Sequence, residues 1–372
     1  MHKKRLINVD FLKGLAMIVM IEVHIFNETV FQSIKSSAIF INFINGLVAP
    51  TFIFTSGFAF YISSLRRLPE LHFFNKEFNN QLKRMFFLIV AGYSLHLPFY
   101  SLEDVIYRSS YDNLISFFKF DVLQCIGLGL IVLLFFRTLL KNNFSNIIAV
   151  SILFISFILL TPIVWKIDFN QFFHLSIATI FNNKYKALFP IFPWFAFIFS
   201  GYILGYLYTK YKDEQLDNFL KITLYVGLIL VFIPHALYLY DKVSFDTGLK
   251  SSPLFTLLRL GYLLTLFSLS YYLTERVDLS NSFFINVSRE SLFVYWFHLQ
   301  IMYRKFFNGK SLIDYFPNSL CLTQTMLLSL VLILLMIVLA YYWNKLKNQY
   351  NDVAEYIKYS FLLTLLFSFI IL

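Results

Sequence analysis

Long apolar stretches alternate with short polar segments along nearly the whole of this 372-residue chain. A helix of about 20 apolar residues is long enough to cross the hydrocarbon core of a bilayer. The pattern therefore predicts an all-α polytopic membrane protein, a single bundle of ten or eleven transmembrane helices. The predicted helices cover 11–30, 38–64, 83–102, 121–139, 143–165, 187–208, 220–240, 252–274, 288–304, 318–343 and, as a short segment whose crossing of the membrane stays open, 359–372.

The composition supports this prediction. Hydrophobic residues make up 58% of the chain and charged residues only 14%, whereas a soluble domain carries about 25% charged residues. No soluble domain, long linker or internal repeat interrupts the pattern, so we expect one transmembrane domain over 1–372, with a core at about 5–343. The two cysteines, Cys125 and Cys321, fall in predicted helices and are interpreted as buried thiols, and their spacing predicts no metal site.

The distribution of Lys and Arg predicts the orientation of the chain. Cytoplasmic loops are enriched in these residues, which places the N-terminus on the inside and the protein in the cytoplasmic membrane. The net charge of +10 is then a topology signal, and without a soluble domain behind a basic patch nucleic-acid binding is excluded. The apolar segment after the N-terminus contains Glu22 and His24 and lacks a cleavage site, so it is no signal peptide. The predicted inside segments are 1–10, 66–84, 137–141, 210–221, 275–289 and 345–358.

The first predicted helix has Asp10 and Lys13 at its entrance, and Glu22 and His24 within its apolar run. Lys13 and His24 are eleven residues apart, which is close to three full turns, so they share one face about 16 Å apart along the axis. A cation at the membrane surface and a general base deeper in the bilayer would suit a long donor with a phosphate tail. The alternative is a positively charged anchor and a polar packing residue.

The ninth predicted helix repeats this layout. Ser291, Tyr295 and His298 form one polar stripe, and Arg289 stands at its cytoplasmic end. Two helices that each combine a surface cation with a deeper histidine favour a polar cavity over isolated packing residues.

Other polar side chains fall inside predicted helices, where each is costly in lipid. Arg259 cannot lose its proton, so it needs a carboxylate, with Glu22 the first candidate, several carbonyl groups or an anionic ligand. Gln124 shares a face with Asp121 and could bond across helices or orient an acceptor. His96 and His235 are interpreted as hydrogen-bonded between helices, and the Gly201/Gly205 pair as a close packing site.

Six stretches spread along the chain form an ordered set of motifs. The opening is R-x4-D-x2-[RK]-G-L-A followed by M-x3-H, with Arg5, Asp10, Lys13, Gly14, Met20 and His24; then follow A-P-T-F-I-F-T-S-G-F at 49–58, V-L-Q-C-I-G at 122–127, F-P-I-F-P-W at 189–194, S-P-L-F-T-L-L-R-L-G-Y at 252–262 and S-R-E-S-L-F-V-Y-W-F-H at 288–298. Together they resemble the transmembrane acyltransferase superfamily, specifically its bacterial branch similar to heparan-alpha-glucosaminide N-acetyltransferase. No single stretch is diagnostic, but their number, order and spacing make the likeness fairly specific.

The resemblance implies that an acyl group passes from cytoplasmic acetyl-CoA, or another acyl-CoA, to a hydroxyl or amine of a glycan or glycolipid on the far side. It also implies that His24 is functionally essential. Lys13 stands where an arginine is usual, which keeps the charge but loses bidentate recognition of phosphate. The 27–37 stretch lacks a histidine that animal relatives carry, so direct transfer is the simpler expectation. The expected roles are catalysis by His24 and His298, donor binding by Asp10, Lys13, Lys83, Arg84 and Arg289, and acceptor binding by Glu22, Gln124, Trp194, Arg259, Ser291 and Tyr295.

Two other classes of function stay open from the sequence. A secondary transporter or lipid-linked-glycan flippase would also place histidine and arginine inside the membrane, although no inverted repeat is visible. A structural scaffold would leave the two histidine-bearing helices unexplained. The oligomeric state, monomer or homodimer, is not determined by the pattern.

Overall fold

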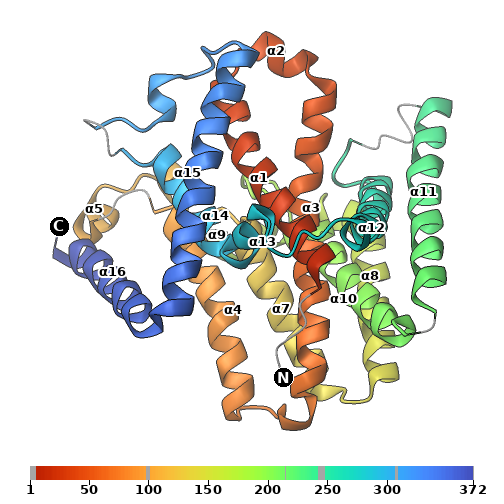
Figure 1. Cartoon of the computed structure of the whole chain (residues 1–372). Coiled ribbons are helices and arrows are strands. Elements are labelled where there is room, and N and C mark those ends of the chain that lie inside the picture. The colour runs from red at the N-terminus through yellow and green to blue at the C-terminus, as the bar shows by residue number, and fades with distance from the viewer. Residues whose placement is uncertain (1–5, 98–100, 214, 242–247, 306–308, 372) are drawn as a thin grey trace. The chain divides into compact units, whose positions relative to one another are not determined.

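The computed structural model describes residues 6–97, 101–213, 215–241, 248–305 and 309–371 (Figure 1). The described chain is built from helices, which confirms the predicted all-α membrane fold. Within these described ranges, eight helices are long and apolar enough to cross a bilayer; α1 and α4 carry more charge, and α14 is short. Arg5 and the basic residues before it lie outside the described part, so the cytoplasmic N-terminus stays a prediction.

The chain forms two compact units. The first comprises Met1–Ala49, Phe99–Arg108 and Ser270–Leu372. Its helices are α1 Ile7–Thr29, α2 Gln32–Ser37, the first part of α3 Ile39–Arg67, α5 Leu102–Tyr107, the end of α12 Pro253–Arg276, α13 Phe283–Arg289, α14 Ser291–Tyr303, α15 Leu322–Gln349 and α16 Asn351–Ile371, with a short 3-10 turn η3 Ile313–Tyr315.

The second unit comprises Pro50–Pro98 and Ser109–Leu269. It holds the rest of α3 and of α12. Its other helices are η1 Leu68–Glu70, α4 Lys76–Leu95, α6 Tyr111–Phe117, α7 Val122–Leu139, α8 Asn143–Val164, η2 Phe169–Gln171, α9 Leu175–Phe181, α10 Ile191–Tyr211 and α11 Leu216–Tyr240. The prediction of a single domain stays a prediction.

Each predicted helix except the one over 288–304 corresponds to a single helix in the described part of the chain, but two begin well before their predicted starts. The helix predicted at 83–102 is α4, Lys76–Leu95, and the one predicted at 359–372 is α16, Asn351–Ile371. In both, the first turns are polar, so hydropathy misses them. In α4 the side chain of Asn75 caps the helix by accepting a hydrogen bond from the Phe78 N–H at 2.8 Å.

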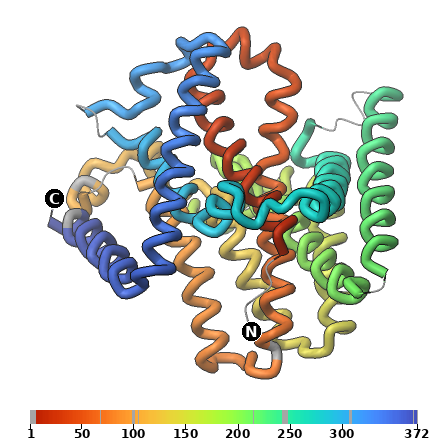
Figure 2. Tube along the Cα trace, viewed as in Figure 1, coloured from red at the N-terminus to blue at the C-terminus, as the bar shows by residue number. Residues whose placement is uncertain are grey.

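In the first unit, α1 packs against α13 and α15 (Figure 2). The contact with α13 depends on Gly14, where a Cβ atom would stand 2.1 Å from the carbonyl oxygen of Phe284. Such a distance is far below van der Waals contact, so only glycine lets the two backbones approach this closely.

The helix predicted over 288–304 is not continuous, and this prediction was wrong. The chain leaves helical geometry at Glu290, which separates α13 from α14. The carboxylate of Glu290, only 4% exposed, pairs with Lys347 of α15 at 2.7 Å. Close by, the amide of Asn344 donates a hydrogen bond to Asn286 at 3.0 Å. These contacts with α15 stabilise the break, which apolar periodicity could not reveal.

In the second unit, α3 and α10 meet through reciprocal glycines. A Cβ at Gly57 would stand 1.9 Å from the Ile198 carbonyl oxygen, and one at Gly201 would stand 1.9 Å from that of Phe54. Gly205 lies one turn further, against Tyr61. The predicted packing role of the Gly201/Gly205 pair is thus confirmed.

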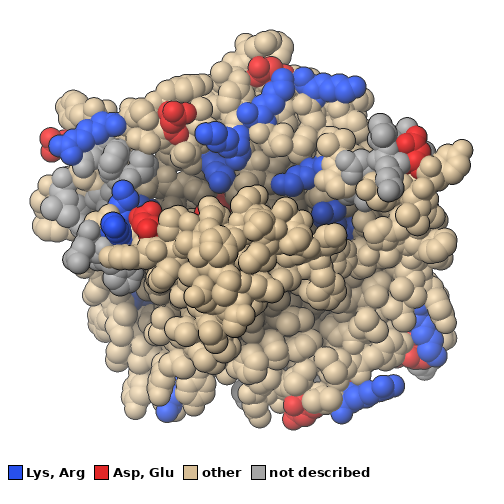
Figure 3. Space-filling model, turned by 90° about the horizontal axis from the view of Figure 1, so that it is seen from above, with Lys and Arg blue, Asp and Glu red and all other residues tan. Residues whose placement is uncertain are grey.

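Arg137, which we assigned to an inside loop, instead lies in the last turn of α7 with a fully buried side chain. Its guanidinium carbon is 5.6 Å from the centroid of the Tyr61 ring. On the face that Figure 3 shows, Lys, Arg, Asp and Glu form small separate groups among other residues.

Candidate functional site

Two polar side chains one helical turn apart, His24 and Glu28, stand near the end of α1. An i, i+4 spacing places them on the same helix face. The backbone here is fixed by the loop before α15, because the N–H of Asn318 donates to the Glu28 carbonyl at 3.0 Å and that of Leu320 to Thr29 at 2.9 Å. This end of α1 is therefore held in place within the first unit.

Tyr303, the last residue of α14, bridges these two side chains. Its hydroxyl donates a hydrogen bond to Glu28 Oε1 at 3.1 Å and lies 3.4 Å from Nδ1 of His24. Because the tyrosine proton goes to the carboxylate, the tyrosine oxygen is left to accept from His24. The network then assigns the proton of His24 to Nδ1 and the lone pair to Nε2. A lone pair on Nε2 is what a general base requires.

His298 packs directly against His24, with ring centroids 5.5 Å apart. Its Nδ1 lies 2.8 Å from the Val294 carbonyl oxygen, which can only accept, so Nδ1 carries the proton. Its Nε2 is fully buried and has no hydrogen-bond partner among the described residues. Leaving a buried acceptor unpaired costs about 1–3 kcal/mol, so this atom calls for an explanation such as a ligand contact.

The break at Glu290 is what allows His298 to reach His24. Along α13, Phe284 contacts Gly14 of α1. Four residues later, the hydroxyl of Ser288 donates to Asp10, one turn nearer the start of α1, at 3.3 Å. The chain thus runs against α1 through α13. It must change direction before α14 can follow α1 toward His24.

The residues predicted to bind the donor are divided between the two units. In the first, Asp10 accepts from Ser288, Lys13 is partly buried on α1, and Arg289 is exposed in the last turn of α13. In the second, Lys83 and Arg84 are exposed on α4. Their joint role in binding phosphate stays a prediction.

Three predicted acceptor residues lie in the first unit. Tyr295 packs its ring against His298 with centroids 5.6 Å apart. Ser291 is the first residue of α14 and belongs to the same predicted polar stripe. Glu22 accepts a hydrogen bond at 2.8 Å from the amide of Asn45, once that amide is turned to satisfy its neighbours. Its pairing with Arg259 would join the two units and stays a prediction.

Gln124 lies in the second unit, fully buried between α7 and α4. A Cβ at Gly92 would stand 2.4 Å from its amide oxygen, so this glycine makes room for the amide. Nearby, His96 is paired with Asp121, Nε2 to Oδ2, at 3.1 Å. Asp121 also caps α7 by accepting from the N–H of Val122 at 2.7 Å.

Trp194 and Arg259 meet around an aromatic ring. Trp194 packs edge-on against Phe255 with centroids 5.9 Å apart, and the Arg259 guanidinium carbon lies 3.6 Å from the centroid of the same Phe255 ring. Lys250, in the preceding loop, places its Nζ 5.9 Å from the Trp194 ring centroid. Partial burial, and then the charge of Arg259, lower the pKa of Lys250.

Tyr303 and Glu28 were not among the predicted members of the site. The i, i+4 spacing of His24 and Glu28 was a usable signal, because it places both on one face of a helix. Tyr303 has no such signal, since it reaches Glu28 only through the path of α14.

A family profile described as "Heparan-alpha-glucosaminide N-acetyltransferase, catalytic" matches residues 5–242, more than half of the chain. The match includes α1 with His24 but ends before α13 and α14, which bring His298 and Tyr303 to it. No curated protein matches the chain closely enough to be named as a relative.

Proposed function

We propose, because this chain belongs to the heparan-alpha-glucosaminide N-acetyltransferase catalytic family, that it moves an acetyl or other short acyl group across a membrane. Membership makes it a membrane acetyltransferase. The donor would be a cytoplasmic acyl-CoA, and the acceptor a hydroxyl or amine of an extracytoplasmic glycan. The observation that supports this best is the hydrogen-bonded row His24–Tyr303–Glu28, with His298 packed against it.

His24 is the general base in this proposal. Its Nε2 takes the proton of the acceptor hydroxyl or amine as that group attacks the thioester carbonyl. The new bond joins the acceptor oxygen or nitrogen to the acyl carbon, and the carbon–sulfur bond breaks. The imidazolium then returns its proton to the leaving thiolate. While it is charged, Tyr303 and the carboxylate of Glu28 stabilise it, as a carboxylate does for the histidine of a hydrolase triad.

His298 acts on the acceptor. Its buried Nε2 is a hydrogen-bond acceptor that can hold an O–H or N–H next to His24. On the donor side, α1 runs unbroken from Ile7 to Thr29, so Lys13 lies on the face of His24, about 16 Å away. Lys13 and Arg289 would bind phosphate, and a compact ammonium at 13 binds it as a point charge.

The test is transfer of label from radiolabelled acetyl-CoA to cell-envelope glycans by the purified full-length protein. We expect His24→Ala to lower the rate by about 10²- to 10⁴-fold, the range of general acid–base catalysis. His235→Ala is the matched control: His235 is also a helix histidine, paired with the Tyr262 hydroxyl at 3.0 Å in the second unit.

Transfer by His24→Ala at the wild-type rate would refute the role of His24. Equal losses in both variants would point to a general effect on folding, which size-exclusion chromatography separates from catalysis. Movement of a glycan or solute across vesicles without any acyl-CoA would instead favour a transporter.

A further inference from the structure

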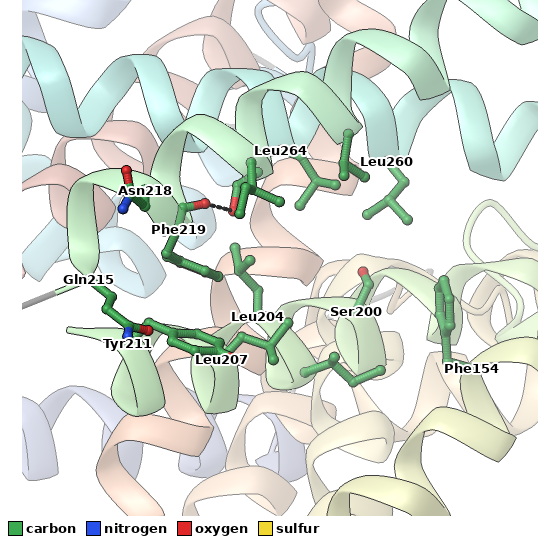
Figure 4. Close-up of a pocket in the computed structure, with 14 residues that line it drawn as sticks. Phe154, Ser200, Leu204, Leu207, Tyr211, Gln215, Asn218, Phe219, Leu260 and Leu264 are labelled. Atoms are coloured by element: carbon green, nitrogen blue, oxygen red, sulfur yellow. Dashed lines mark hydrogen bonds between the residues drawn. The ribbon is translucent and has the colours of Figure 1, made fainter.

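A cavity of about 530 Å³ lies within the second unit, and none of its lining residues is a histidine (Figure 4). Its walls come from α8, α10, α11 and α12. Its volume is in the range of small-molecule sites, about 300–1,000 Å³. The lining is mainly aliphatic and aromatic, with Ile203, Leu204, Leu207, Leu260 and Leu264 among its members.

The cavity has one polar end. Figure 4 places Tyr211, Gln215 and Asn218 together at one end, and Leu260, Ser200 and Phe154 toward the other. Gln215 and Asn218 are exposed amides at the start of α11. Ser200 and Tyr211 are eleven residues apart on α10, so the cavity extends over roughly 16 Å of helix.

The hydroxyls in the apolar part are satisfied by their own helices. Thr223 donates to the Phe219 carbonyl oxygen at 2.8 Å and Ser200 to that of Phe197 at 2.9 Å. A buried water needs two to four polar partners, and these hydroxyls have already used their protons. The apolar part is therefore better suited to hydrocarbon than to water.

The cavity opens to the surroundings of the protein beside α11. Ile222 and Val226 line it and are nevertheless 61% and 42% exposed. All four lining helices are long and apolar enough to cross a bilayer, so the medium at this opening is lipid. Gly227 and Gly261 let the backbones of α11 and α12 meet, which holds these two walls of the cavity together.

We propose that this cavity binds one acyl chain of a bilayer phospholipid, with its head at Gln215 and Asn218. The amide N–H groups can donate to the phosphate and ester oxygens, and Lys212 supplies a cation at the same turn between α10 and α11. The chain itself displaces the cavity's empty space, gaining dispersion contacts along the aliphatic wall. The site is separate from the proposed acyl transfer, which does not depend on it.

The experiment uses a phosphatidylcholine probe with a photoreactive diazirine in one acyl chain. The full-length protein is reconstituted in phosphatidylcholine vesicles, irradiated over a range of probe fractions, and digested for peptide mapping. We expect saturable labelling of α10 and α12 at the cavity. Leu264→Trp, which fills it, should lower this labelling about tenfold, and Leu207→Trp is the second filling variant if the first fails to fold.

Ile229→Trp is the matched control, because Ile229 is 53% exposed on α11 and is not part of the lining. It should leave the labelling of the cavity unchanged. The double variant Gln215→Ala, Asn218→Ala should raise the half-saturating probe fraction at least threefold, and an unchanged value would overturn the assignment of the head. Labelling that rises without saturation and ignores both filling variants would mean that only bulk lipid touches these helices.

Discussion

Histidines occur in both units, and their surroundings differ in a way that separates packing from chemistry. In the second unit, His96 pairs with Asp121 and His235 with Tyr262. In the first unit, His24 and His298 lie ring against ring, and Nε2 of His298 has no hydrogen-bond partner among the described residues. A histidine hydrogen-bonded to a partner stabilises the fold. A buried ring nitrogen without a hydrogen bond lowers the stability of the fold, and a contact with a ligand can offset that loss.

The glycines of the two units differ less than the histidines do. Gly14 in the first unit and Gly57 and Gly201 in the second all allow one backbone to touch another. Close helix contact is therefore common to both units. What distinguishes the first is the group of polar side chains that its close contact brings together.

The largest expected effect is on the packing of the second unit. Gly201→Val would force a side chain into the space of the Phe54 carbonyl, so we expect the free energy of unfolding to fall by about 3 kcal/mol or more. Gly309→Ala is the control for added volume, since nothing lies within 4 Å of its Cβ position; its positive φ of 76° should cost only about 1 kcal/mol. Thermal unfolding in detergent measures both. A Gly201→Val protein as stable as the wild type would contradict the backbone contact.

The second-largest effect should come from removing His298, whose Nε2 has no hydrogen-bond partner among the described residues. We expect His298→Ala to lower the transfer rate about 100-fold, because the acceptor loses the nitrogen that positions it next to His24, and His96→Ala to leave the rate within a few-fold. Initial rates at saturating acetyl-CoA measure both. If His96→Ala and His298→Ala slow transfer equally, the distinction between a histidine paired for packing and one that acts in catalysis is wrong.

Removing the Tyr303 hydroxyl, which bridges His24 and Glu28, should have a smaller effect on the transfer rate. Tyr303→Phe removes the hydroxyl between His24 and Glu28, and loss of such a supporting partner typically costs about 10–100-fold. Tyr262→Phe makes the same change beside His235 and should leave transfer unchanged. The rate should be followed against pH, because a merely structural role for Tyr303 would not change the profile. An unaltered profile and rate in Tyr303→Phe would remove the support of His24 by Tyr303 and Glu28 from the mechanism.

The smallest effect concerns the break between α13 and α14. Lys347→Met leaves the buried carboxylate of Glu290 without its cation, and we expect a loss of about 1–3 kcal/mol of stability. Lys345→Met, on the same helix, is the control. Denaturant unfolding compares them, and equal stability of the two variants would show that the ion pair does not support the break.

The sequence by itself determined the helices, because apolar stretches of membrane length are a local property. It also placed His24 and Lys13 on one face of α1 and identified the Gly201 contact, since both depend only on spacing along a single helix. His298 was found from its polar stripe, although the stripe was assigned to a helix that is in fact broken.

Only the tertiary structure decided that His24 and His298 meet, because their contact depends on the change of direction at Glu290. That break is stabilised by Lys347 on α15, more than fifty residues further along the chain. The same holds for Tyr303, whose hydroxyl reaches Glu28 through the path of α14. Local patterns fix what each helix can present, but the ion pairs and backbone contacts between distant helices decide which side chains come together.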